Sequence, residues 1–141
     1  MDREAIKKIL PHREPMLLLD EVEQDAEGNA LGRYTVRGDE WFLQGHFPGN
    51  PVVPGVILCE IMAQVCCAFL VEKAIGKTPY YTGLNNVRFK KPVKPGDTLE
   101  MHCQMTKAKP PFYFASGRGT VDGVVAITGE FSFALVDHET K

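Results

Sequence analysis

The run from Gly55 to Ile75 reads GVILCEIMAQVCCAFLVEKAI and predicts one long helix. Between Val56 and Val71 only Glu60 and Gln64 carry polar side chains, so the predicted helix is apolar in nearly every direction around its axis. A helix of this kind is buried. The run is shorter than the about 20 apolar residues that cross a bilayer and it contains a glutamate, so it predicts a core helix and not a membrane span.

Glu60 and Gln64 are four residues apart and therefore share one face of the predicted helix. A buried carboxylate is costly to desolvate, so such a group has hydrogen-bond partners, an altered pKa or a functional role. We expect the amide of Gln64 to steady the carboxylate of Glu60. Burial alone leaves the choice between a structural and a functional role for Glu60 open.

The segment before the helix, residues 46–55, reads HFPGNPVVPG. A histidine is neutral near working pH and can accept a proton, so His46 is a candidate base. Gly55 opens the helix, where free backbone N–H groups can hold a carbonyl oxygen that gains negative charge. These groups suit acid–base chemistry beside a carbonyl, with His46 removing an α-proton and Glu60 protonating a departing hydroxyl. The alternative is a structural histidine in a stiff loop.

The rest of the chain predicts short elements around this helix. A helix is expected from Asp2 to Leu10, and strands are expected at Met16–Gln24, Ala30–Arg37, Tyr80–Lys91, Thr98–Lys107, Phe112–Val121 and Val124–Val136. Asp122-Gly123 is a hairpin signal. One buried helix and five or six mostly antiparallel strands describe a single α+β domain, residues 1–141, whose curved sheet wraps the helix. Such a sheet leaves one side of the helix uncovered, so we expect a dimer.

Composition excludes several kinds of partner. The net charge of −2 gives no basic field for nucleic acid. The four cysteines, Cys59, Cys66, Cys67 and Cys103, suit reduced and packed thiols, and the four histidines, His12, His46, His102 and His138, lack the spacing of a metal site. The first ten residues are charged throughout, which predicts no signal peptide and a cytoplasmic protein.

The segment GHFPGNPVVPGVILCEIMAQ, residues 45–64, resembles the signature of the FabZ-type 3-hydroxyacyl-[acyl-carrier-protein] dehydratases, which have the hot-dog fold. The resemblance extends to residues 6–22, 85–97 and 120–131. It implies that His46 and Glu60 are catalytic, that Gly55 donates a backbone N–H to the thioester carbonyl, and that Gln64 orients Glu60. It also implies a homodimer in which each site takes His and Glu from different chains, assembled as a trimer of dimers.

The implied reaction is dehydration of a (3R)-3-hydroxyacyl chain on the phosphopantetheine arm of acyl carrier protein, to the trans-2-enoyl thioester, in fatty acid biosynthesis. No other cofactor, no metal and no membrane is implied. Residues that could line an acyl tunnel, or equally belong to the core, are Ile57, Ile61, Met62, Tyr80, Tyr81 and Phe89. The basic cluster of Arg88, Lys90, Lys91 and Lys94 is a candidate docking patch for the acidic carrier protein, or a solvated strand edge.

Three other functions fit the same pattern less well. A hot-dog thioesterase would use a carboxylate to activate water, and a non-catalytic acyl-binding module would need neither His46 nor Glu60. The dehydratase/isomerases of the FabA type carry Asp where this chain has Glu60, which favours the plain dehydratase. Three positions depart from the family pattern. Glu14 stands where the family often has an aromatic residue in its PHRxP segment, Val53 replaces a common Met, and the run from Lys109 to Pro111 replaces a turn that usually contains glycine.

Overall fold

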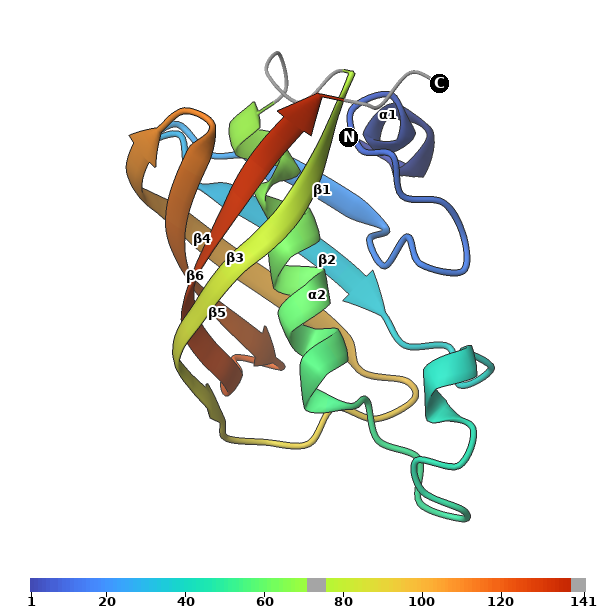
Figure 1. Ribbon diagram of the computed structural model, residues 1–141. Coiled ribbons are helices and arrows are strands. Elements are labelled where there is room, and N and C mark those ends of the chain that lie inside the picture. The colour runs from blue at the N-terminus through green and yellow to red at the C-terminus, as the bar shows by residue number, and fades with distance from the viewer. Residues whose placement is uncertain (71–75, 138–141) are drawn as a thin grey trace.

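A six-stranded antiparallel sheet curves around one central α-helix in the computed structural model, which describes residues 1–70 and 76–137 (Figure 1). The strands are β1 (Glu21–Gln24), β2 (Ala30–Thr35), β3 (Lys77–Phe89), β4 (Thr98–Lys109), β5 (Phe112–Val121) and β6 (Val124–Asp137). Their order across the sheet is β1-β2-β4-β5-β6-β3, which leaves β1 and β3 at the edges. The α+β architecture expected from the sequence is confirmed.

The central helix is shorter than predicted. α2 spans Gly55–Val65 and is followed by the 3-10 helix η2, Cys66–Leu70, while residues 71–75 of the predicted helix lie outside the described part of the chain. The helix tightens here because the N–H of Cys66 donates to the carbonyl of Ala63, three residues back. In the described part of the chain, no helix is both long and apolar enough to cross a membrane.

The N-terminal helix α1 spans Arg3–Lys7 and ends three residues earlier than predicted. Asp2 is its N-cap, because its side chain accepts a hydrogen bond of 3.0 Å from the N–H of Ala5. A short 3-10 helix, η1, spans Trp41–Leu43. Phe42 in this turn is buried, whereas Trp41 is exposed.

The first strand is also shorter than predicted, since β1 begins at Glu21 and not at Met16. The carbonyl of Met16 and the N–H of Leu18 are hydrogen bonded to the side chain of Gln64 on α2. Backbone groups used in this way cannot take part in a strand ladder. At the other end of the sheet, Asp122 and Gly123 have φ angles of 51° and 78° and form the expected hairpin between β5 and β6.

Two glycines let α2 lie close to the inner face of the sheet. A Cβ on Gly32 of β2 would come within 2.4 Å of Val65 Cγ2, and one on Gly117 of β5 within 2.7 Å of Met62 Sδ. The side of α2 that faces the sheet is buried in the core, whereas Val56 on the same helix is 75% exposed. The sheet therefore covers α2 on one side only.

Candidate active site

Glu60 lies in the second turn of α2, with its side chain 23% exposed. Its Oε2 accepts a hydrogen bond of 2.8 Å from Nε2 of Gln64, so the contact expected from their spacing is present. The carboxyl group is less buried than the sequence predicts because it opens onto a pocket between α2 and the edge of the sheet. The carboxyl group of Glu60 is thus accessible to a ligand, while the hydrogen bond from Gln64 holds its orientation.

Gln64 is the most completely bonded side chain of the site, and it is 1% exposed. Its Oε1 accepts from the N–H of Leu18 at 2.8 Å, while Nε2 donates to the carbonyl of Met16 at 2.8 Å and to Glu60. Both amide protons and the carbonyl are therefore used, which fixes the orientation of the amide. Gln64 ties the loop of residues 16–18 to the carboxyl group of Glu60.

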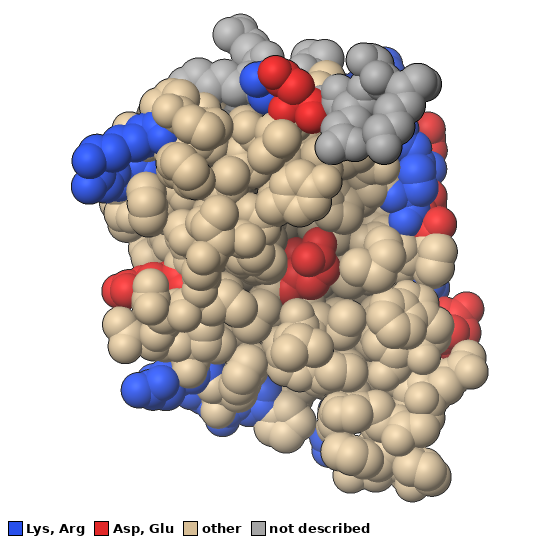
Figure 2. All heavy atoms as spheres, in the orientation of Figure 1, with Lys and Arg blue, Asp and Glu red and all other residues tan. Residues whose placement is uncertain are grey.

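The pocket beside Glu60 is apolar and small, with a volume of about 80 Å³. Its wall includes Tyr80 and Tyr81 from β3 together with Phe133 and Leu135 from β6. The hydroxyl of Tyr81 donates to the carbonyl of Cys59 on α2, and burial raises the pKa of Tyr81, so this phenol stays neutral. Figure 2 shows that the face over α2 and β3 consists mostly of uncharged side chains.

His46 lies in the loop between η1 and α2 and is half-buried. Its Nδ1 is 3.0 Å from the carbonyl of Val52, and its ring stacks on Phe47 with centroids 4.2 Å apart. A carbonyl can only accept, so the neutral ring carries its proton on Nδ1 and leaves Nε2 free to take a proton. This tautomer is the one that a catalytic base requires.

The N-terminus of α2 offers backbone N–H groups next to this loop. Pro54 is the N-cap and provides no side-chain cap, and the first turn has no hydrogen bond from the N–H of Gly55 to any acceptor in the described residues. The ring of Phe89 packs over Gly55, because a Cβ there would lie 2.8 Å from its Cζ. A shallow groove beside Gly55 is lined by Val52, Val56, Phe89, Lys90 and Lys91, among others.

The predicted acid and base do not meet within one chain. His46 precedes α2 and Glu60 lies in its middle, and within the described ranges the two side chains share neither a contact nor a pocket. Gly55, similarly, borders a different hollow from the pocket of Glu60. The chain therefore presents two half-sites, one with His46 and Gly55 at the end of α2 and one with Glu60 along its side.

The other predicted residues fall into three groups. Ile57, Ile61 and Met62 are packed in the core, whereas Tyr80 and Phe89 are more than half exposed, at 58% and 55%. Of the basic cluster, Arg88, Lys90 and Lys94 are exposed and Lys91 is half-buried. Lys90 and Lys91 border the groove at Gly55, which places two of the predicted docking residues beside that half-site.

One residue at the site was missed by reasoning from the sequence. His12 Nε2 lies 3.3 Å from Oε2 of Glu60, and His12 lines the same pocket. The two residues are far apart in the chain, so no spacing rule links them. The available signal was the PHREP segment itself, a histidine in a charged and irregular stretch that belongs to the family resemblance.

Comparison with known proteins shows the family. Residues 10–130 match the family described as the FabA-like domain. Over 137 residues the chain is 44% identical to the 3-hydroxyacyl-[acyl-carrier-protein] dehydratase FabZ of Clostridium perfringens, with 96% of this chain and 99% of that protein covered. The chain belongs to this FabZ-type dehydratase family. FabZ of Thermomicrobium roseum is also 44% identical over 137 residues, with 95% and 92% covered. The resemblance based on the signature is confirmed.

Solved structures similar to this FabZ-type chain share its fold. The dehydratase heterocomplex ApeI:P from Xenorhabdus doucetiae matches with a TM-score of 0.79 and 22% identity, covering 96% of this chain and 91% of that one. A hypothetical thioesterase with coenzyme A from Streptococcus pneumoniae matches with a TM-score of 0.62 and 15% identity, covering 85% and 88%. At these identities the similarity establishes the hot-dog architecture and carries no information on the reaction.

Proposed function

We propose that this FabZ-type protein is a hydro-lyase of fatty acid biosynthesis. It dehydrates a (3R)-3-hydroxyacyl chain carried by acyl carrier protein to the trans-2-enoyl thioester. The observation that carries the proposal is the carboxyl group of Glu60, which opens onto an apolar pocket while a buried glutamine holds one of its oxygens. An accessible acid beside an apolar wall suits protonation of a hydroxyl on an acyl chain.

The proposed reaction uses three groups in defined roles. Nε2 of His46 takes the proton from the carbon next to the thioester carbonyl. The N–H of Gly55 holds the carbonyl oxygen as negative charge builds on it. Glu60 gives its proton to the 3-hydroxyl, which leaves as water as the carbon–carbon double bond forms. The reaction is balanced without a metal or another cofactor, and the only prosthetic group is the phosphopantetheine of the carrier protein.

A complete site then requires two chains, because His46 and Glu60 belong to separate half-sites of one chain. We propose a homodimer in which His46 of one protomer faces Glu60 of the other. The uncovered side of α2 and the free edge of β3 support this, since exposed apolar side chains gather there: Val56, Tyr80, Leu84 and Phe89. An unpaired edge beside an apolar face is a common dimer interface. By resemblance, three such dimers form the full assembly in the cytoplasm, and the mass in sedimentation should equal six chains.

Complementation between two inactive variants tests the shared site. His46→Ala and Glu60→Gln are each expected to lower turnover by about 100-fold or more. When both are co-expressed in equal amounts, activity should return to about a quarter of wild type, because half the dimers are mixed and each mixed dimer keeps one intact site. Mixed dimers without activity would contradict the shared site, and full activity of either single variant would contradict its proposed role.

The products of the same assay distinguish the proposed reaction from thioester hydrolysis. Incubation with a trans-2-enoyl thioester should give the 3-hydroxyacyl thioester reversibly, with no free thiol. Release of thiol at a comparable rate would identify a thioesterase. A 3-enoyl product, separated by chromatography and identified by mass, would add isomerase activity.

A further inference from the structure

His12 approaches Glu60 from the loop between α1 and β1. Its Nε2 lies 3.3 Å from Oε2 of Glu60, and both side chains are about four-fifths buried, with 21% and 23% exposed. The other ring nitrogen, Nδ1, is buried and finds no hydrogen-bond partner anywhere in residues 1–70 or 76–137. A largely buried histidine against the proposed acid has no role in the reaction described above.

The surroundings of the two ring nitrogens decide where the proton of His12 resides. Nε2 faces a carboxylate oxygen, which only accepts, so an N–H there is favourable. An N–H on Nδ1 would be buried without an acceptor, which is costly. A neutral imidazole has one ring proton, and this geometry favours the tautomer with the proton on Nε2.

Oε2 of Glu60 accepts a hydrogen bond from Nε2 of Gln64 and lies within ion-pair distance, 3.3 Å, of Nε2 of His12. Oε1 has no hydrogen bond to any of the described residues. We propose that His12 is a positioning residue that, with Gln64, holds Oε2, so that Oε1 is the oxygen that exchanges the proton with the substrate. This inference rests on the proposed role of Glu60 as the acid.

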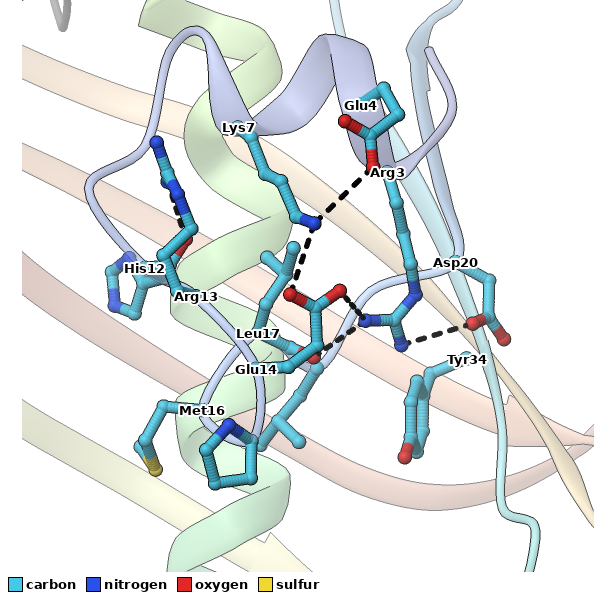
Figure 3. A network of polar contacts seen from close by, with 12 residues as sticks. Arg3, Glu4, Lys7, His12, Arg13, Glu14, Met16, Leu17, Asp20 and Tyr34 are labelled. Carbon is cyan, nitrogen blue, oxygen red and sulfur yellow. Dashed lines mark hydrogen bonds and ion pairs between the residues drawn. The ribbon is translucent and has the colours of Figure 1, made fainter.

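The loop that carries His12 is held in place by a cluster of charged groups (Figure 3). From α1, Arg3 and Lys7 both point to Glu14, with N–O distances of 3.1 and 3.0 Å. Arg3 also donates to the carbonyl of Leu17 at 3.1 Å. The loop is thus bonded to α1 through Glu14, and to α2 through the hydrogen bonds of Gln64 with Met16 and Leu18. These bonds fix the position of the loop, and so they fix the position of the His12 ring beside Glu60.

Turnover of three variants separates positioning from general structural support. His12→Leu removes the donor and should lower kcat by about 10- to 100-fold with KM changed less than about twofold, because the substrate still binds but meets a misoriented acid. His12→Gln keeps an N–H at similar reach and should recover most of the loss. The matched control is His102→Leu, since His102 also lies near a carboxylate, Asp25 at 3.9 Å, on an exposed part of the sheet, and it should leave kcat unchanged.

Nitrogen-15 NMR of the wild-type ring tests the contact without a variant at position 12. In spectra recorded at about pH 8, His12 should show a protonated Nε2 and a bare Nδ1. In Glu60→Leu, which lacks the acceptor, this preference should weaken, because only the burial of Nδ1 then still opposes the other tautomer. A proton on Nδ1 in wild type, unchanged kcat in His12→Leu, or equal losses in the Leu and Gln variants would each overturn the proposal. If Glu60→Gln kept full turnover, the proposed role of Glu60 as the acid would fail while the dehydratase function stood, and the NMR result would still report whether His12 contacts Glu60.

Discussion

Gln64 donates to Oε2 of Glu60 across 2.8 Å, one helical turn along α2, while its other two hydrogen bonds go to the loop of residues 16–18. This one amide connects the proposed acid to a segment that joins α1 to the sheet. Stability and catalysis should therefore change together when the amide is removed.

Gln64→Leu should lower the free energy of unfolding by about 2–4 kcal/mol, because the buried N–H of Leu18 and carbonyl of Met16 lose their partner. The same variant should lower kcat, since Glu60 loses its stronger donor. Urea unfolding at neutral pH and steady-state kinetics measure the two effects. Ile61→Val, one turn away in the core, is the control and should reduce stability by about 1 kcal/mol without changing kcat. Wild-type kcat in Gln64→Leu would contradict the orienting role.

Glu40, just before η1, predicts a loss of stability in acid. It is buried and accepts from the Tyr34 hydroxyl at 2.6 Å and from the N–H groups of Arg37 and Gly38. Burial alone raises the pKa of Glu40, but these hydrogen bonds outweigh it and hold the pKa below the ordinary value of 4.5.

The stabilisation from ionised Glu40 is therefore present above about pH 4.5 and is lost as the pH falls through its lowered pKa. Glu40→Gln should cost about 1–2 kcal/mol at pH 7 and progressively less in acid. Urea unfolding of both proteins at several pH values measures this difference. A difference that stays constant with pH would show that Glu40 acts through packing alone.

Glu14 gives a salt-sensitive test of the loop that carries His12. Its own backbone N–H, then Lys7 and Arg3, lower the pKa of Glu14 to about 2, so the stabilisation from its ionised form is fully present above about pH 4.5 and is lost as the pH falls through about 2. Glu14→Gln should speed amide hydrogen exchange of Leu17 and Leu18, and high salt should do the same in wild type because the pairs are exposed. Glu27→Gln, in the turn after β1, should leave this exchange unchanged.

If the basic patch binds acyl carrier protein, charge reversal there should weaken binding of substrates carried by that protein and of no others. A Lys90→Glu, Lys94→Glu double variant should raise KM for an acyl chain on acyl carrier protein by about 10-fold, and its salt dependence should weaken. KM for the same chain on a short pantetheine thioester should not change. Lys8→Glu, which reverses an exposed charge near the N-terminus and outside the patch, is the control. Equal defects with both substrates would assign these lysines to the acyl site.

The sequence was most informative where one pattern governs one element. The apolar run with two polar residues predicted α2 and the contact between Glu60 and Gln64, and turn residues placed the β5–β6 hairpin. The predicted start of β1 was wrong because tertiary hydrogen bonds decide it, whereas α1 and α2 end earlier than predicted at local backbone hydrogen bonds of Lys8 and Cys66. Gln64 takes the backbone groups of Met16 and Leu18 out of the first strand, and no local propensity encodes that bond.

The residues of the candidate site could be named from the sequence, whereas their arrangement, with His46 and Glu60 from different chains, was only implied by the family resemblance. The signature named His46, Gly55, Glu60 and Gln64, but residues on one helix and its preceding loop do not reveal which of them share a cavity. His12 shows the same limit, since its contact with Glu60 depends on the path of a loop held by Arg3 and Lys7. Charge pairs between distant segments leave no periodic trace in a sequence.

The absence of a Cβ at Gly32 and Gly117 limits which substitutions such an enzyme can accept during evolution. Because Val65 and Met62 of α2 occupy the space that a Cβ would need, a larger residue at Gly32 or Gly117 would force these side chains or the helix to shift. Substitutions at these two glycines would therefore disturb the helix that carries Glu60. Adaptation to longer or shorter acyl chains would then proceed by substitutions on the uncovered side of α2 and along β3, which leave the contacts of α2 with Gly32 and Gly117 unchanged.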